Sequence, residues 1–356
     1  IILWKDITRF YAEIFGFVSF LRNFAAMKYS FVVPVFNRPD EVRELLASLC
    51  EQKYKDFEVI IVEDGSQVKC EAEVETFRTQ LDIRYYYKDN SGPGQTRNYG
   101  VERAQGTYII VLDSDVVIPP DYLNAVEAEL EAAPCDAFGG PDRAHSSFTP
   151  IQKAINYAMT SFFTTGGIRG GRKQKLDKFY PRSFNMGVRR SVYNDLQGFS
   201  KMRFGEDIDF STRIFEGGYD CRLFPEAWVW HKRRTDLKKF FKQVHNFGIA
   251  RINLTQRHPG TLKIVHLLPA VFTIGCLLLL FSGFFFPWAW ALLALYALMV
   301  FVDAGIRNRS LLVGLLAVPA AFVQLIGYGT GFLRAWWRQR VLGKSEFEAF
   351  KKNFYK

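Results

Sequence analysis

The sequence predicts an α/β domain with a mostly parallel sheet flanked by helices, followed by apolar helices suited to a membrane. Short β-branched runs alternate with helical segments between residues 27 and 230, as they do in parallel α/β sheets. Residues 264–302 contain no Asp, Glu, Lys or Arg, and this run is too long for a soluble core helix. The hydrophobic share of 49% excludes a disordered chain and permits a large core.

The first segment, residues 1–26, has apolar side chains at helical spacing, for example Phe10, Ile14 and Phe17. Its charged residues make a membrane span or a cleavable signal sequence a poor fit. We interpret the segment as an N-terminal amphipathic helix on a membrane surface. Two alternatives of similar weight are a helix that packs on the protein itself and a leader upstream of a true start at Met27.

The α/β domain is expected over residues 27–235. Three buried strands are predicted in it, at residues 31–35, 59–62 and 107–112. The polar residues that follow these strands are Asn37, the run 63–66 and the run 113–115. They should meet at the carboxyl edge of the sheet, where open α/β sheets bind ligands.

Two aspartates one residue apart, Asp113 and Asp115, follow the third of these strands. Such a pair can hold a hard divalent cation that also binds a substrate diphosphate. By itself the pair is a weak signal, because carboxylates after a strand more often cap a helix or form a turn. The motifs around it make the metal site the better interpretation.

Six motifs follow one another in an order typical of one enzyme family. They are PVFNR at 34–38, VEDGS at 62–66, GPGQTRNYG at 92–100, LDSD at 112–115, FNMG at 184–187 and GEDID at 205–209. With these motifs, residues 28–235 resemble the family 2 glycosyltransferases, which are inverting enzymes of the Rossmann-like GT-A fold that use nucleotide-activated sugars. The resemblance identifies the catalytic core but neither the donor sugar nor the acceptor.

The resemblance implies a set of donor-binding residues: Pro34, Asn37, Asp64, Arg97, Asp113 and Asp115. Asp64 is expected at the nucleotide base or ribose, and Arg97 near the diphosphate. Asp113 and Asp115 should bracket the nucleotide sugar. Asp115 and His231 are the residues expected next to the metal, which would be Mg²⁺ or Mn²⁺.

On the acceptor side, Asp207 matches the catalytic base of the family, and Asn185 and Glu206 belong to its acceptor or loop motifs. The chemistry also needs these residue types. Departure of a nucleoside diphosphate builds negative charge that a cation neutralises, and the acceptor hydroxyl must lose a proton to a base. The alternatives are that Glu206 and Asp207 cap a helix and that His231 is an ordinary surface histidine.

The net charge of +10 is concentrated in residues 166–190, 231–260 and 332–356. Local basic clusters favour phosphates or anionic lipid over nucleic acid, for which the sequence shows no recognition motif. The glycine-rich basic run 166–173 is not a P-loop, and it fits an acceptor phosphate, lipid headgroups or a solvated loop. The same alternatives stay open for the basic residues 232–234 and 238–239, for which a role as membrane-proximal anchors is a further alternative.

The membrane region is expected over residues 263–335, after a basic membrane-proximal segment at 236–262 and before a basic tail at 336–356. The uncharged run 264–302 predicts two spans. A second uncharged run, 311–333, contains Pro319 and four glycines and has basic residues on both sides. It is therefore either a third span or a re-entrant element.

These observations predict an inverting, metal-dependent, hexosyltransferase-type enzyme. It would move one sugar from a nucleotide-diphosphate sugar, with a UDP-sugar favoured, to a lipid-linked acceptor at the cytoplasmic face of the inner (plasma) membrane, as a multi-pass protein. A processive polysaccharide synthase is disfavoured because residues 243–247 read QVHNF instead of Q-x-x-R-W. The remaining alternatives are a polyprenyl-phosphate glycosyltransferase and a non-catalytic sugar-nucleotide binder, and the intact carboxylates disfavour the binder.

Overall fold

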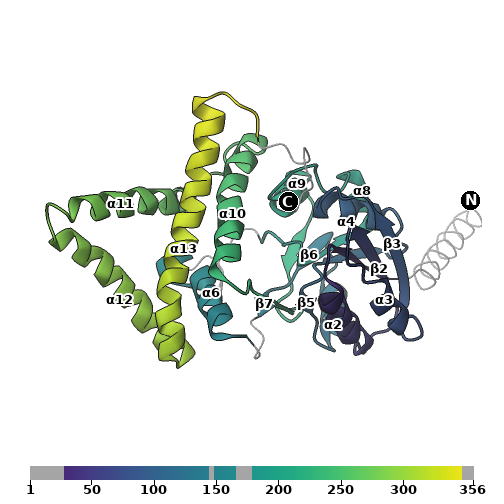
Figure 1. The fold of residues 1–356 in the computed structure, drawn as a ribbon. Coiled ribbons are helices and arrows are strands. Elements are labelled where there is room, and N and C mark those ends of the chain that lie inside the picture. The colour runs from purple at the N-terminus through teal and green to yellow at the C-terminus, as the bar shows by residue number, and fades with distance from the viewer. Residues whose placement is uncertain (1–27, 144–147, 166–178, 347–356) are drawn as a thin grey trace, which may run out of the picture.

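Residues 28–143, 148–165 and 179–346 are described by the structure, a computed structural model of the chain. Figure 1 shows an α/β part that contains the sheets and a helical part beside it. The expected amphipathic helix at 1–26, the basic glycine-rich run at 166–173 and the end of the basic tail lie outside the described residues.

The main sheet has seven strands among the described residues, in the order β3-β2-β1-β4-β8-β6-β9. Their bounds are β1 Tyr29–Val35, β2 Phe57–Asp64, β3 Asp82–Lys88, β4 Tyr108–Leu112, β6 Ala137–Gly139, β8 Asn185–Arg189 and β9 Cys221–Leu223. Only β8 runs against its neighbours, β4 and β6, and the other pairs are parallel. The predicted mostly parallel α/β sheet is confirmed.

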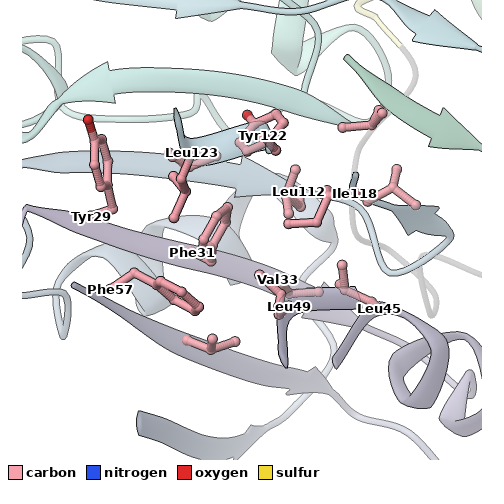
Figure 2. Close-up of a cluster of buried hydrophobic side chains, with 14 of the residues drawn as sticks. Tyr29, Phe31, Val33, Leu45, Leu49, Phe57, Leu112, Ile118, Tyr122 and Leu123 are labelled. Carbon is pink, nitrogen blue, oxygen red and sulfur yellow. The ribbon is translucent and has the colours of Figure 1, made fainter. Parts of the chain in front are cut away.

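Helices cover both faces of this sheet, which is why its central strands are apolar along their whole length. On one face, Phe31 and Leu112 of the strands meet Leu45 of helix α2 (Pro39–Cys50) and Leu123 of helix α5 (Tyr122–Ala132), as Figure 2 shows. Helix α3 (Glu71–Phe77) lies on the same face, where its Val74 joins this cluster. The opposite face packs against α4 Pro93–Val101, α8 Arg190–Asp195 and α9 Glu206–Glu216.

A small second sheet lies next to the end of β4 and has the order β5-β10-β7. Its strands are β5 Val116–Val117, β7 Asp142–Arg143 and β10 Val229–His231. β10 pairs antiparallel with β5, so that His231 lies opposite Val116. This register returns the chain to the Asp113–Asp115 segment more than 100 residues later.

Four long helices form the rest of the described chain: α10 Leu237–Arg257, α11 Leu268–Ser282, α12 Trp288–Asn308 and α13 Leu311–Trp336. A 3₁₀ turn, Ile264–His266, precedes α11, and a π turn, Trp337–Val341, follows α13. α10 and α13 lie side by side, while α11 and α12 form a V that points away from the sheets (Figure 1). Helices α6 (Pro150–Thr160) and α7 (Phe162–Thr165) contact α13.

Among the described helices, α12 and α13 are long and apolar enough to cross a membrane. The expectation of two spans within 264–302 needs correction, because α11 has 15 residues and a crossing takes about 20. The span-length helix α12 begins in that run at Trp288 and extends beyond it to Asn308. The second candidate span is instead α13.

α13 continues as one helix through Pro319 and its four glycines. The glycines mark places where neighbouring backbones come close. A Cβ on Gly331 would collide with the carbonyl of His245 in α10, and one on Gly329 with the carbonyl of Pro269 in α11. Small residues at helix contacts permit such close packing, so the glycines of the second uncharged run serve packing and do not interrupt the helix.

Candidate active site

Asp113, Asp115 and His231 come together at the end of β4. One possible ligand atom from each residue lies within 4.8 Å of the others, and the His231 Nε2 is 3.2 Å from the Asp115 Oδ1. The pairing of β10 with β5 brings His231 here, and the Phe184 ring, 4.7 Å from the imidazole centroid, packs against it. The structure thus assembles the predicted metal-binding set.

The atoms of this set are suited to a divalent cation. Asp115 is only 7% exposed, yet its Oδ1 accepts no hydrogen bond from the described residues, and the Nδ1 of His231 is also buried without a partner among them. Buried polar atoms without partners are uncommon in folded proteins. Two carboxylates and an imidazole together form a donor set that divalent metals accept.

Positive charge surrounds Asp115. Its Oδ2 lies 3.4 Å from Nη1 of Arg38 and 3.7 Å from Nη1 of Arg234. Burial by itself would raise the pKa of Asp115, but His231, Arg234 and Arg38 outweigh it and hold that pKa well below its usual range. Burial would lower the pKa of His231, and the Asp115 carboxylate reverses this, so that the pKa is raised. Asp115 is therefore an ionised carboxylate in a cationic surrounding.

Sequence reasoning missed Arg38 and Arg234 as site residues. Arg38 stands in the PVFNR motif, but Arg234 belongs to the run 232–234, for which a membrane-proximal anchor is one of the open alternatives. The structure disfavours the anchor, because each residue of the run faces an acidic group of the α/β part. Lys232 pairs with Glu44 at 2.5 Å, Arg233 with Asp142 at 2.5 Å, and Arg234 faces Asp115.

Asp64 lies at the carboxyl end of β2, as expected, but its carboxylate is turned toward its own chain. Its Oδ1 accepts from the Lys88 ammonium at 2.9 Å and from the Ser91 amide at 2.8 Å, and its Oδ2 accepts from the Gly92 amide at 2.9 Å. Asp64 therefore holds the loop that leads into α4, the helix that carries Arg97. Its expected contact with a nucleotide stays a prediction.

Asn37 and Pro34 shape the end of β1. The Asn37 backbone has a φ of +54°, a region that Asn tolerates better than most residues. Its side-chain oxygen accepts from the Gln67 and Val68 amides at 2.7 and 2.9 Å. Asn37 thereby joins the loops that follow β1 and β2. Pro34 lies beyond the β1–β4 pairing, which ends at Val32.

Arg97 connects the end of β4 with the start of α9. It is 3% exposed, donates from Nη2 to the Asp113 Oδ1 at 2.6 Å, and donates from Nη1 to the Glu206 Oε1 at 3.2 Å. Burial raises the pKa of Glu206 despite the opposing charge of Arg97. Glu206 therefore binds Arg97 and does not cap the helix, whose N-cap residue is Gly205.

Asp207 lies in the first turn of α9 with its side chain 20% exposed. Its Oδ2 is 3.6 Å from Nε of Arg182, and its Oδ1 accepts from the amide of Ile208 at 2.9 Å. Arg97 thus bridges two neighbouring carboxylate centres. One contains Asp113 and Asp115, and the other contains Asp207.

Asn185 is buried at the start of β8, where both amide atoms bind the protein. The Tyr122 hydroxyl donates to its Oδ1 at 2.6 Å, and its Nδ2 donates to the Ala227 carbonyl at 2.8 Å. Asn185 holds the segment that leads into β10 and His231. Its expected place in an acceptor or loop motif stays a prediction.

Comparison with known proteins agrees with this arrangement. Residues 30–197 match the family described as Glycosyl transferase family 2. These residues therefore form a domain of this family, and the α/β part has the GT-A fold. The match covers β1 through α8 and so includes Asp113 and Asp115, while Asp207 and His231 lie beyond it.

Two relatives and one solved structure illustrate the similarity. The pre-mycofactocin glycosyltransferase of Mycobacterium tuberculosis is 29% identical over 232 residues, 64% of this chain and 47% of that protein. The poly(ribitol-phosphate) beta-N-acetylglucosaminyltransferase TarS of Staphylococcus aureus is 34% identical over 135 residues, 36% of this chain and 22% of that protein. The mannosyltransferase PcManGT from Pyrobaculum calidifontis, in complex with GDP-Man and Mn²⁺, aligns with a TM-score of 0.56 and 17% identity over 88% of each chain, and so shares the fold.

This chain spans less than half the length of the two relatives. The matched parts are 47% of the Mycobacterium protein and 22% of TarS. The similarity therefore establishes a family 2 glycosyltransferase domain over residues 30–197 and the fold of the α/β part. Substrates and partners are the subject of the proposals that follow.

Proposed function

We propose that this chain is an inverting glycosyltransferase that moves one sugar from a nucleotide-diphosphate sugar to a lipid-linked acceptor. The observation that carries the proposal is the pair of carboxylate centres joined by Arg97, with Asp113, Asp115 and His231 on one side and Glu206, the neighbour of Asp207, on the other. Transfer of a sugar with inversion needs a cationic site for the leaving group and a separate base.

Asp113, Asp115 and His231 would hold the Mg²⁺ or Mn²⁺ ion. Mg²⁺ prefers oxygen ligands in octahedral geometry, so the imidazole makes Mn²⁺ the better fit. When bound, the metal neutralises negative charge on the leaving diphosphate. Arg38 and Arg234, which face the Oδ2 of Asp115, add fixed positive charge on the same side. The Mn²⁺ and GDP-Man in the PcManGT complex support this assignment, and a UDP-sugar remains the donor expected from the sequence.

Asp207 would accept the proton of the acceptor hydroxyl as that oxygen attacks the anomeric carbon. The sugar then passes to the acceptor in one displacement, which inverts its configuration. A polyprenyl-phosphate acceptor is the second candidate, because Arg182 lies 3.6 Å from Asp207 and would bind an anionic acceptor oxygen. Such an oxygen needs no base.

Apolar surface on the helical part supports the lipid-linked acceptor. The turn between α11 and α12 and the first residue of α12 expose four neighbouring aromatic side chains: Phe284, Phe285, Phe286 and Trp288. Large exposed apolar patches mark membrane or protein contacts. Only 17% of the apolar stretch of α12 is buried inside the protein, against 44% for α13. We therefore propose membrane association through these helices. Placement in the inner membrane with several crossings stays a prediction from the sequence.

A donor screen tests the proposal. The full chain in lipid nanodiscs is incubated with UDP- and GDP-sugars, with Mn²⁺ or with excess chelator, and release of the nucleoside diphosphate is measured with and without added polyprenyl phosphate or a lipid-linked saccharide. We expect Mn²⁺-dependent release that one of the two lipids stimulates. Release that chelator does not reduce would reject the metal site, and no release with any donor would reject the activity.

A further inference from the structure

The first turn of α9, which carries Asp207, is packed directly against α10. Gly205, the residue before α9, has a φ of +86°, a left-handed conformation that favours glycine. A Cβ placed on it would lie 3.1 Å from the Cβ of Ala250 and 3.3 Å from Cδ1 of Leu254. The turn that sets the direction of α9 therefore fits against α10 with no space for a larger residue.

A buried polar contact joins the same two helices. Asp209 accepts from the Ser200 hydroxyl at 2.6 Å and from Nε of Arg213 at 3.0 Å. Its other oxygen, Oδ1, lies 3.0 Å from Nε2 of His258, the residue that ends α10. His258 also places Nδ1 3.0 Å from the Glu216 carboxylate at the far end of α9. One imidazole thus reaches both the first and the last turn of α9.

An apolar contact completes the connection. Phe204, just before Gly205, packs against a buried cluster formed by Ile249 and Ile252 of α10, Ala270 of α11, and Phe332 and Ala335 of α13. The loop that leads to Asp207 is therefore anchored among the apolar helices. By contrast, the partners of Asp113 and Asp115 described above all belong to residues 28–234.

α10 is itself held tightly by α13. A Cβ on Gly248 would collide with the carbonyl of Tyr328. His245 Nδ1 lies 3.1 Å from the Thr330 hydroxyl, and Nε2 of Gln339 donates to Asn253 at 2.7 Å in a buried pair. Because polar contacts and close backbone packing run along its length, α10 cannot shift without displacing the span-length helix α13.

We propose that α10, through His258, is the element that positions the base Asp207, while the metal and donor side is held by contacts within residues 28–234. This inference rests on the proposed role of Asp207. His258 is a positioning residue: it contacts Asp209, two residues after the base, and does not act on the substrate. The inference predicts that damage to the α9–α10 contact loosens the first turn of α9 and leaves nucleotide binding intact.

The test uses the full chain in lipid nanodiscs and compares His258→Ala with native protein. Hydrogen–deuterium exchange is followed in peptides covering residues 205–216 and 108–117, and binding of UDP with Mn²⁺ is measured by calorimetry. Loss of a buried hydrogen bond should speed exchange at 205–216 by about tenfold or more. Exchange at 108–117 and the UDP affinity should stay within about twofold. Turnover of the donor found in the screen should fall while its KM is unchanged.

Two further variants separate positioning from general damage. His258→Gln keeps a donor toward Asp209 and should restore slow exchange at 205–216. His266→Ala removes a histidine from the turn after α10, where its ring binds the Lys263 amide, and should match native protein in every measurement. If His258→Ala prevents folding, Ala250→Val crowds Gly205 without removing a buried polar group, and should give the same selective pattern.

The inference is overturned if His258→Ala, or Ala250→Val in its place, leaves exchange at 205–216 unchanged. It is also overturned if exchange at 108–117 speeds up as much as exchange at 205–216, or if UDP affinity falls by a similar factor. The exchange pattern does not depend on any substrate. If the donor screen finds no activity but the selective pattern is present, the function fails and the α9–α10 coupling stands.

Discussion

The end of β4 and the first turn of α9 carry the two carboxylate centres, but different contacts hold the two places. Asp113 and Asp115 follow a strand of the main sheet, and β10 brings His231 to them through a backbone register. Asp207 begins a helix whose position depends on side-chain contacts with α10. Backbone pairing and ion pairs within residues 28–234 hold the Asp113–Asp115 site, whereas the position of Asp207 depends on the packing of the apolar helices.

This difference predicts different effects for substitutions at the end of β4 and for substitutions around α9. Variants at the end of β4 should remove charge from the metal and donor side and so weaken the binding of metal and nucleotide. Variants around α9 should leave those ligands bound and reduce transfer. The predictions below, from the largest expected effect to the smallest, would sharpen or break this division.

Asp115→Asn should have the largest effect. It removes the buried charge that faces His231, Arg38 and Arg234, and with it one ligand of the proposed metal. We expect turnover to fall by at least about 10³-fold, with Mn²⁺-dependent UDP binding lost in calorimetry. The matched control is Asp121→Asn, which changes an exposed aspartate paired with Lys53 and should be neutral. Normal Mn²⁺-dependent binding by Asp115→Asn would remove Asp115 from the metal site.

Asp207→Asn should lower turnover on a hydroxyl acceptor by about 10²-fold or more, because the base is lost. UDP affinity should remain near native, since the Asp207 side chain faces Arg182 and is not one of the Asp113, Asp115 and His231 group. The measurement is steady-state kinetics with the donor identified in the screen. A mild loss would indicate a phosphate acceptor, and a matching loss of UDP affinity would contradict the division between the two halves.

Arg234→Gln should weaken UDP binding in the presence of Mn²⁺ by about tenfold, the value of one charge-assisted contact. Its control is Lys232→Gln, two residues earlier, whose ammonium pairs with Glu44 near the surface. Such exposed pairs contribute little, so affinity should stay within about twofold. Equal effects of the two variants on membrane association, with no effect on UDP, would restore the anchor interpretation of residues 232–234.

Gly331→Ala should destabilise the helical part, because a Cβ there collides with the His245 carbonyl of α10. Overpacking of this kind costs about 1–3 kcal/mol, which thermal unfolding in nanodiscs would detect. The control is Gly275→Ala in α11, where nothing lies within 4 Å of the added carbon. Alanine in an open helical position should be neutral or slightly stabilising. Equal unfolding temperatures for the two variants would contradict the close packing of α10 and α13.

Much of the α/β part could be predicted from the sequence because its signals are local. Strands at 31–35, 59–62 and 107–112 are short apolar runs, and the structure places β1, β2 and β4 there. The Asp113–Asp115 pair follows its strand directly, so its place at the carboxyl edge was also predictable. Residues close together in the chain share one element, and hydrophobic periodicity is enough to place that element.

Contacts between distant segments were decided only by the tertiary structure. From the sequence, residues 232–234 have several possible roles, a membrane anchor among them, and residues 311–333 are either a third span or a re-entrant element, because charge and glycine content do not say what lies opposite a residue. The register of β10 puts Arg234 beside Asp115. The approach of α10 makes the glycines of α13 packing sites and sets His258 against Asp209. Such contacts depend on how complete elements pack, which no local pattern of residues encodes.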